Sequence, residues 1–286
     1  MLGNSWFKKE KPLLGLTGMG GGADSKLVGG ADFWLPFPNY LRPDDNGSYL
    51  VLAMPLNGDY TDYAHLLNGG ATETSRTWSS STGTGGIVEF QTSQYKFYNN
   101  AFRTYNGSGG ACASTGDMTN SDFLFTTSED FCVELWAYID SNSSDCSLFG
   151  TAKDPSLPAS VGGKMGVNVR GAGSGVTGSM HMASVSGTQR SPNNTWGYGA
   201  WHHYAVTRSG TTLEYWYDGT SVGSHTLTGD YPGSSYNDAN QLILGFSNPH
   251  APTSSTNKNT YINDVRVYKG VAKYTSAFTP PSSMVI

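Results

Sequence analysis

The sequence predicts an all-β fold, a two-sheet antiparallel jelly-roll sandwich, and three observations lead to this prediction. First, the 286 residues include 37 Gly and 13 Pro, while 13% are aromatic. This composition leaves few windows for a long helix but supplies large side chains for sheet faces. Second, apolar residues recur at every second position in short runs between turn signals, which is the period of a strand. Third, about a dozen such runs follow one another without an intervening helix, as in a two-sheet sandwich.

The clearest of these patterns lies at residues 201–227 and predicts a β-meander of three strands. Tyr204 and Val206 alternate in the first run, and the second run shows the same period. A glycine-containing loop at 208–211 separates these two runs. Asp218-Gly219 then ends the second run with residues that tolerate the positive φ of a tight hairpin. No helical period fits this stretch.

The remaining strands are predicted from the same alternation. The run 131–139 is expected to be a core strand, because its odd-numbered residues from Phe131 to Ile139 are all apolar. The polar loop 140–145 then suggests that 147–150 returns as its antiparallel partner. Further strands are expected at 49–54, around Trp78, and at 87–90, 96–98, 101–105, 164–169, 180–183, 241–246 and 261–268.

Residues 1–45 differ from the rest and are expected to form an extended N-terminal docking arm, followed by one β-sandwich over residues 46–286. The segment is rich in glycine at 18–22, and Pro36 and Pro38 exclude regular structure there. Its aromatic residues are too many for a solvated tail, so we expect them to become ordered on a partner or on the sandwich. The alternative is a flexible leader with incidental aromatics. The aromatic residues of the arm are Trp6, Phe7, Phe33, Trp34 and Phe37.

Charge and cysteine content exclude several classes of function. The net charge is −5, and lysines or arginines cluster only at Lys8, Lys9 and Lys11. Nucleic acid is therefore an unfavourable partner. No apolar stretch is long enough for a signal peptide or a membrane span. Three cysteines without paired C-x-x-C spacing indicate reduced thiols rather than a disulfide framework or a zinc site, with a Cys132–Cys146 bridge left open.

Four runs, taken in order, resemble a known family. They are FCVELWAYID (131–140), GAWHHYAVTRSGTTLEYWYDGT (199–220), LILG (242–245) and YINDVRVYKGVAKYTSAFTPP (261–281). Together they resemble the signature runs of the laminin-G-like branch of the concanavalin A-like lectin/glucanase fold, and the resemblance extends over roughly residues 46–281. The closing run is most similar to versions of this domain in structural proteins of tailed bacteriophages, especially marine ones.

The resemblance implies a concanavalin A-like sandwich in a non-enzymatic virion structural protein, most readily a capsid decoration protein. Such a protein is made in the host cytoplasm without a signal peptide and lies on the virion surface. Its partners would be a major capsid or tail protein, bound through the arm, and further copies of the chain, since many copies or a homo-oligomer are expected. The alternative is a carbohydrate-binding adhesin on a tail fibre or cell surface that contacts a host glycan. A glycoside hydrolase is the third hypothesis.

The carboxylates argue against catalysis. A retaining glycosidase needs two carboxyl groups about 5 Å apart, and the enzymes of this fold carry them as Glu-x-Asp-x-Glu or a slightly longer form. Here the nearest grouping is Glu129, Asp130 and Glu134, whose spacing does not match. Glu134 is therefore expected to make a structural hydrogen bond or to face solvent. His202 and His203 are adjacent on a strand, so they point to opposite faces and cannot share a metal.

Sugar binding would need aromatic side chains beside polar loop groups. The candidates for carbohydrate contact are Trp196, Tyr198, Tyr231 and Tyr236. In the competing interpretation these rings cap the edge of the sandwich or contact a neighbouring subunit.

No cofactor is expected, although many members of the fold hold Ca²⁺ with loop oxygens. Oxygen donors occur at Asp140, Asn142 and Asp145, and at Asn237, Asp238 and Asn248. They form no complete ligand set in the sequence, and such residues also form turns.

Overall fold

The computed structural model of the chain describes a β-sandwich whose residues all belong to the unit Pro38–Ile286. The described residues are 44–64, 76–82, 84–105, 111–115, 122–123, 125–126, 129–140, 146–152, 165–171, 177–184, 187–190, 194–195, 197–227, 241–246 and 259–282. The aromatic residues of the predicted arm lie outside them. The boundary between residues 45 and 46 therefore remains a prediction.

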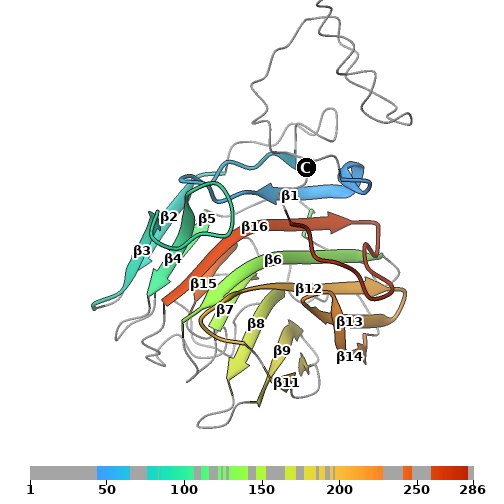
Figure 1. Cartoon of the computed structure of the whole chain (residues 1–286). Coiled ribbons are helices and arrows are strands. Elements are labelled where there is room, and N and C mark those ends of the chain that lie inside the picture. Colours follow the sequence, from blue (N-terminus) through green and yellow to red (C-terminus); the bar gives the residue numbers. More distant parts are fainter. Residues whose placement is uncertain are drawn as a thin grey trace, which may run out of the picture. The chain divides into compact units, whose positions relative to one another are not determined.

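The first of two sheets, called here the front sheet, has the strand order β14-β13-β12-β6-β16-β4-β3, and β1 also pairs with β16 (Figure 1). All of its pairings are antiparallel. Its strands are β1 (Leu50–Met54), β3 (Ile87–Gln91), β4 (Ala101–Tyr105), β6 (Phe131–Ile139), β12 (Trp201–Ser209), β13 (Thr212–Tyr217), β14 (Thr220–Thr226) and β16 (Asn259–Lys269). A short 3-10 turn, Gly47–Tyr49, leads into β1.

The second sheet, called the back sheet, has the order β10-β9-β8-β7-β15-β5-β2, with β11 paired to β9. Its pairings are also antiparallel. Its strands are β2 (Trp78–Thr82), β5 (Ala111–Thr115), β7 (Cys146–Ala152), β8 (Met165–Gly171), β9 (Thr177–Ser184), β10 (Gly187–Arg190), β11 (Asn194–Thr195) and β15 (Gln241–Phe246). Among the described residues, no helix is long and apolar enough to cross a membrane.

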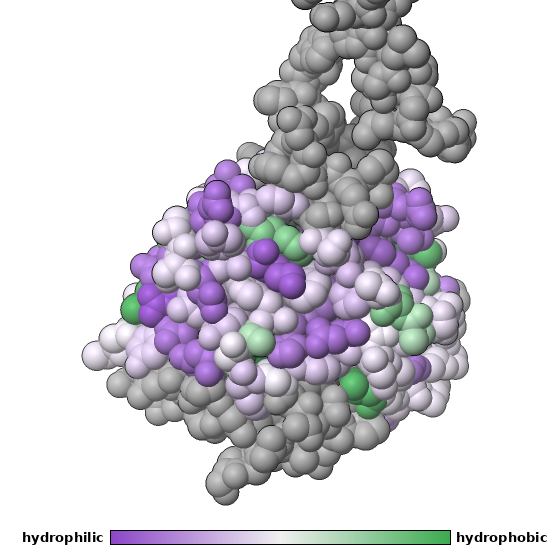
Figure 2. Space-filling view, in the orientation of Figure 1, coloured by the Kyte–Doolittle hydropathy of each residue, from purple (hydrophilic) through white to green (hydrophobic). Residues whose placement is uncertain are grey.

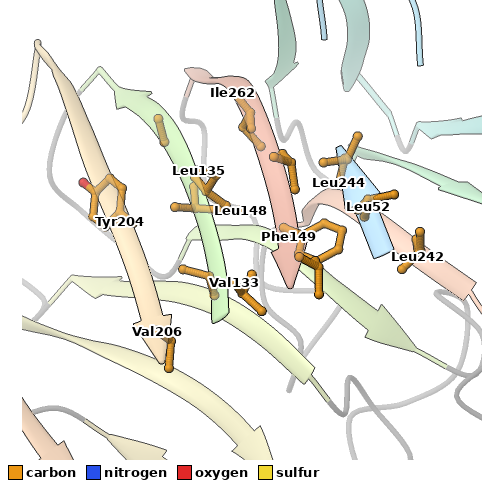
Figure 3. Packing of buried hydrophobic residues seen from close by; sticks show 14 of the residues in the cluster. Leu52, Val133, Leu135, Leu148, Phe149, Tyr204, Val206, Leu242, Leu244 and Ile262 are labelled. Carbon is orange, nitrogen blue, oxygen red and sulfur yellow. The ribbon is translucent and has the colours of Figure 1, made fainter. Parts of the chain in front are cut away.

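The largest apolar cluster among the described residues lies between the two sheets and holds the sandwich together. Front-sheet residues such as Val133 and Leu135 meet back-sheet residues such as Phe149 and Leu244 there (Figure 3). Each of these four side chains is at most 1% exposed. Burying a side chain of this size contributes about 1.5–3 kcal/mol, so this core is the main source of stability. Because side chains alternate along a strand, every second side chain of the front sheet lies on the face opposite the core.

The all-β sandwich predicted from the sequence is confirmed, as is the meander, which forms β12, β13 and β14. The apolar face of 131–139 lies in the core as expected. The predicted hairpin between 131–139 and 147–150 is wrong, because β6 and β7 belong to different sheets. Alternation assigns a strand's faces but not its neighbours, and β6 pairs with β12 and β16 instead.

One further expectation is corrected, and one alternative that the sequence left open is decided. Residues 96–98 form no strand, because Tyr98 and its neighbour Asn99 have φ of 62° and 66°, outside the extended region. The Cys132–Cys146 bridge is not formed, since Cys132 is a free, buried thiol on the front sheet and Cys146 belongs to the back sheet.

Candidate functional site

The outer face of the front sheet is the face turned away from the core, and one part of it is covered by the C-terminal segment 270–282. In Figure 1 this segment is the dark red trace that follows β16. Thr207 on β12 donates a hydrogen bond to the Tyr274 carbonyl at 3.1 Å, and Phe278 N–H donates to the Gly219 carbonyl at 3.0 Å. A Cβ on Gly219 would lie 1.9 Å from the Phe278 oxygen, so only glycine fits this close approach.

Beneath the segment lies a group of buried charges, called here the ion cluster. Glu134 on β6 is its centre, and its Oε1 lies 2.8 Å from Lys273 Nζ, 3.0 Å from the Tyr268 hydroxyl and 3.2 Å from an Arg266 nitrogen. The Tyr274 hydroxyl donates to Oε2. The ion cluster comprises Asp44, Glu134, His203, Asp264, Arg266, Tyr268, Lys273 and Tyr274.

The charges of the ion cluster shift one another's pKa values. Burial alone would raise the pKa of Glu134, but the positive charges of Arg266 and Lys273 hold it well below its usual range. Burial raises the pKa of Asp264 to about 6, although Arg266 opposes the shift. Burial also lowers the pKa of His203, whose Nε2 lies 3.4 Å from Glu134. Glu134 is thus held ionised and His203 is held neutral at pH 7.

This arrangement makes Glu134 a structural residue. Its side chain is 0% exposed, and its two oxygens are occupied by neighbours from β16 and the C-terminal segment. A sugar cannot reach it without displacing that segment. The expectation of a structural hydrogen bond at Glu134 is confirmed, and the glycosidase hypothesis loses the carboxylate on which it depended.

A second part of the outer face is covered by the loop 92–100, which is fixed by Asn263. The Asn263 side chain is 0% exposed and accepts a hydrogen bond from Lys96 N–H at 2.9 Å. It donates to the carbonyls of Pro55, Leu56 and Asn100 at 3.0–3.3 Å. One buried amide therefore positions the loop that carries Lys96.

At one end of the outer face lies a row of partly exposed aromatic side chains, called here the aromatic row. Trp201 on β12 pairs with Tyr138 on β6, and Tyr138 pairs with Tyr261 on β16. The ring centroids are 6.1 Å apart for Tyr138 and Trp201 and 5.6 Å apart for Tyr138 and Tyr261. All three side chains are partly exposed, so three neighbouring strands present three rings on one surface.

Polar groups border the aromatic row on the side of β4. Arg103 lies across from Tyr261, with its guanidinium carbon 5.9 Å from the ring centroid. Arg103 also donates to Glu89 at 2.6 Å and to Asn259 at 2.6 and 3.0 Å. Asn259 donates in turn to Asp140 at 2.7 Å. These partly exposed groups form an ordered hydrogen-bonding border.

The loop that enters β12 lies beside the other end of the row. Gly199 N–H donates to the Ile139 carbonyl at 2.8 Å, and a Cβ on Gly199 would lie 3.9 Å from the Tyr138 hydroxyl. Gly199 has φ of 72°, which favours glycine at this close approach. His202 turns the other way, stacking on Tyr217 at 4.9 Å and bonding Asp218 through Nδ1 at 2.7 Å. His202 and His203 thus point to opposite faces, as expected.

The residues predicted for carbohydrate contact are placed as follows. Tyr198 is half-buried and packs against the core. Trp196, Tyr231 and Tyr236 lie outside the described residues, so their role stays a prediction. The aromatic row was not predicted as a site, although a signal exists: Tyr138 and Tyr261 are large aromatics at the non-core positions of their strands.

For calcium, the described part of the chain offers one of the predicted donors. Asp140 accepts a hydrogen bond from Asn259, and its own N–H donates to the Asn259 carbonyl at 3.1 Å. Within the described ranges, no three His, Cys, Asp or Glu residues are grouped as metal ligands. Asn142, Asp145, Asn237, Asp238 and Asn248 lie outside them, so a calcium site is not assembled from the described residues.

Comparison with known proteins gives the family. The family model described as the concanavalin A-like lectin/glucanases superfamily matches residues 106–273, more than half of the chain. The chain belongs to this superfamily. It is a lectin-like sandwich with the laminin-G-like sequence motifs. No curated protein matches the chain.

Solved structures with a TM-score of 0.50 share this fold at low identity. The binding domain of botulinum neurotoxin serotype D/C VPI 5993 has a TM-score of 0.50 and 13% identity, covering 78% of this chain and 49% of its own. The binding domain of botulinum neurotoxin DC in complex with SialylT has a TM-score of 0.50 and 12% identity, covering 78% and 48%. A carbohydrate esterase from the Shiga toxin-encoding bacteriophage phi24B has a TM-score of 0.46 and 10% identity, covering 68% and 89%. The chain spans about half the length of the toxin domains.

Proposed function

We propose that this sandwich is a non-catalytic module that binds carbohydrate through the aromatic row. The observation that carries the proposal is the alignment of Tyr261, Tyr138 and Trp201 across three strands, with their rings partly exposed. Sugar rings have apolar faces that stack on aromatic rings, while their hydroxyls hydrogen-bond to polar neighbours. Arg103 and Asn259 supply such neighbours at one border. Rigid aromatic anchors beside fixed polar groups are typical of binding sites.

The hydropathy of the outer face favours a polar ligand that stacks on aromatic rings over an apolar protein partner. Figure 2 shows that the described residues on the visible side are mainly hydrophilic or intermediate in hydropathy, with small separate hydrophobic patches. Docking of an apolar protein surface would need a larger continuous apolar patch. The binding domain of botulinum neurotoxin DC, about half of whose length this chain covers, has been solved in complex with SialylT.

A substitution in the middle of the row tests the proposal. In the full chain, Tyr138→Ala removes the ring that contacts both neighbours, and binding to a printed glycan array should weaken about tenfold or more. Tyr49→Ala is the control, since Tyr49 is an exposed tyrosine (43%) away from the row, and its binding should match that of the unmodified chain. A glycan array that stays silent with the unmodified chain, or that responds equally to both variants, contradicts the proposal.

The second part of the proposal is that the module is displayed on a virion surface as a capsid decoration protein. Its support is the closing run YKGVAKYTSAFTPP and the aromatic-rich composition of residues 1–45. The arm would bind a major capsid or tail protein, and many copies would present their sandwiches outward. In the alternative, the same module serves as an adhesin on a tail fibre or a cell surface.

Deleting residues 1–45 separates display from folding. The truncated chain should keep its sandwich, with circular dichroism unchanged in the β region, but it should no longer sediment with particles. Because Asp44 belongs to the ion cluster, a matched deletion of residues 1–43 controls for loss of that contact. Particles that incorporate both truncated forms as well as the full chain would refute the docking role of the arm.

A further inference from the structure

Lys96 stands beside the aromatic row as a fixed cation that has no carboxylate partner among the described residues. Its ammonium lies 3.8 Å from the centroid of the Trp136 ring, a cation–π contact, and 5.9 Å from that of Phe97. Within the described part of the chain, no carboxylate forms an ion pair with it. Burial lowers the pKa of Lys96, with the charge of Asp218 acting in the opposite direction. The ammonium is therefore partly stripped of water but remains accessible.

The acid whose charge acts on Lys96, Asp218, is already hydrogen-bonded. Asp218 Oδ1 accepts a hydrogen bond from the His203 N–H at 2.8 Å, and Oδ2 lies 2.7 Å from His202 Nδ1. Asp218 therefore affects Lys96 only through space, while both its oxygens bind residues of β12. Lys96 is partly desolvated, and the neighbouring acid is hydrogen-bonded to other residues. A ligand that supplies an anionic group would therefore stabilise the ammonium.

The position of Lys96 relative to the row is set by β6. Trp136 and Tyr138 are two residues apart on the same face of this strand, a separation of about 7 Å. The backbone N–H of Lys96 donates a hydrogen bond to Asn263 on β16, and Asn263 pairs with Trp136 on the neighbouring strand β6. A sugar stacked on Tyr138 would thus place a substituent on its neighbouring side over the Lys96 ammonium.

We propose that the carbohydrate bound at the aromatic row is acidic, and that Lys96 binds its carboxylate or sulfate group. The inference rests on the proposed function and adds to it the chemical class of the ligand. Arg103, the other cation at the row, is committed to Glu89 and Asn259. Lys96 is therefore the group that distinguishes acidic from neutral sugars.

The test compares matched glycans with the full chain. A printed array should carry neutral glycans beside their sialylated, uronic-acid and sulfated counterparts. The unmodified chain should bind the acidic members about tenfold more tightly than their neutral counterparts, as a charge-assisted hydrogen bond predicts. Lys96→Gln should bring this ratio close to one while neutral binding persists, and Lys96→Arg should retain most of the preference. Lys269→Gln, with the same change in net charge at a site ion-paired to Glu129, should leave the ratio unchanged.

The outcomes separate the two proposals. If Tyr138→Ala abolishes binding but Lys96→Gln leaves the ratio unaltered, the aromatic row stands and the acidic ligand is refuted. If neutral glycans bind more tightly than acidic ones, the inference is also refuted. A preference confined to sialylated and uronic glycans identifies a carboxylate, and one confined to sulfated glycans identifies a sulfate. If no glycan binds, both proposals fail.

Discussion

At the scale of single residues, Glu134 shows what separates a catalytic carboxylate from a structural one. The residue lies on the outer face of a large sheet, where a reactive acid would have room. Its two oxygens instead face Arg266, Lys273, Tyr268 and Tyr274 in a site without solvent. Ion pairs of this kind cost desolvation, and they are retained only when every charge has partners. Glu134 therefore stabilises the packing of the C-terminal segment on the front sheet.

Removing this carboxylate should be strongly destabilising. Glu134→Ala leaves Arg266 and Lys273 buried beside too few negative charges, so the free energy of unfolding should fall by about 3–5 kcal/mol. Chemical denaturation of the purified chain measures the loss. If the variant does not fold, Glu134→Gln provides a milder change, because it keeps the volume and one acceptor.

The matched control is Glu129→Ala. Glu129 is also an ion-paired glutamate, but it is partly exposed and lies 3.8 Å from Lys269. Surface pairs contribute about 0–1 kcal/mol, so this variant should lose much less stability. Equal stability losses at Glu129 and Glu134 would show that the ion cluster does not hold the fold.

At the scale of elements, β16 organises the domain. Its first half pairs with β4 and its second half with β1, while β6 pairs along its other edge. The change of partner coincides with an irregularity between Asn263 and Arg266, where Asp264 has φ of 56°. The bulge lets both Asn263 and Arg266 face outward, so one strand supplies the residue that anchors the loop and a cation that pairs with Glu134.

The strand pattern could be predicted from the sequence because alternation is a local property. The run 241–246 matches β15, and 101–105 matches β4. Ala111–Thr115 was missed, since its small residues give no apolar alternation although all five are buried. The pairing of β6 could not be predicted, because neighbours across a sheet are chosen by long-range packing.

The candidate site was predictable only in part. Tyr138, Tyr261 and Trp201 lie far apart in the sequence, and their alignment depends on the register of β6 with β12 and β16. Phe97 resembled a strand residue in the sequence. Its N–H lies 3.4 Å from the Asn263 side chain, and the loop around it bends. Sheet order and side chain-to-backbone bonds are therefore the information that local sequence patterns lacked.

At the scale of the whole molecule, the ion cluster joins the segment before the first strand of the sandwich to the segment after its last strand. Asp44 precedes the first strand, and Lys273 follows the last, yet the two form an ion pair with each other and both contact Tyr268. With three carboxylates and two permanent cations, the buried cluster carries one excess negative charge when all five are ionised. Burial raises the pKa of Asp264, and the negative charge of Glu134 acts in the same direction while Arg266 and Lys273 oppose it.

The stability of the sandwich should consequently depend on pH through opposing titrations. His203, whose pKa is lowered, contributes stability above its unfolded value of about 6.5 that is lost as the pH falls. Glu134, whose pKa is held low, loses its contribution only below about pH 4.5. Asp264 acts in the opposite sense: its stabilising effect is full below pH 3.8 and is lost as the pH rises through about 6. Between pH 6.5 and 4, the His203 and Asp264 contributions therefore change in opposite directions.

Asp264→Asn should expose this balance. The substitution removes the Asp264 titration, which spans about two pKa units and so amounts to about 3 kcal/mol. On acidification from pH 7 to 4, the unmodified chain should therefore gain about that much stability relative to the variant. Denaturation midpoints at half-unit pH steps measure the difference, and Asp45→Asn, at a carboxylate outside the ion cluster, controls for the change in net charge. The prediction is wrong if the difference in stability between Asp264→Asn and the unmodified chain stays constant over this range. Asp264 would then have the same pKa in the folded and the unfolded chain, and the stability of the ion cluster would not depend on pH through this residue.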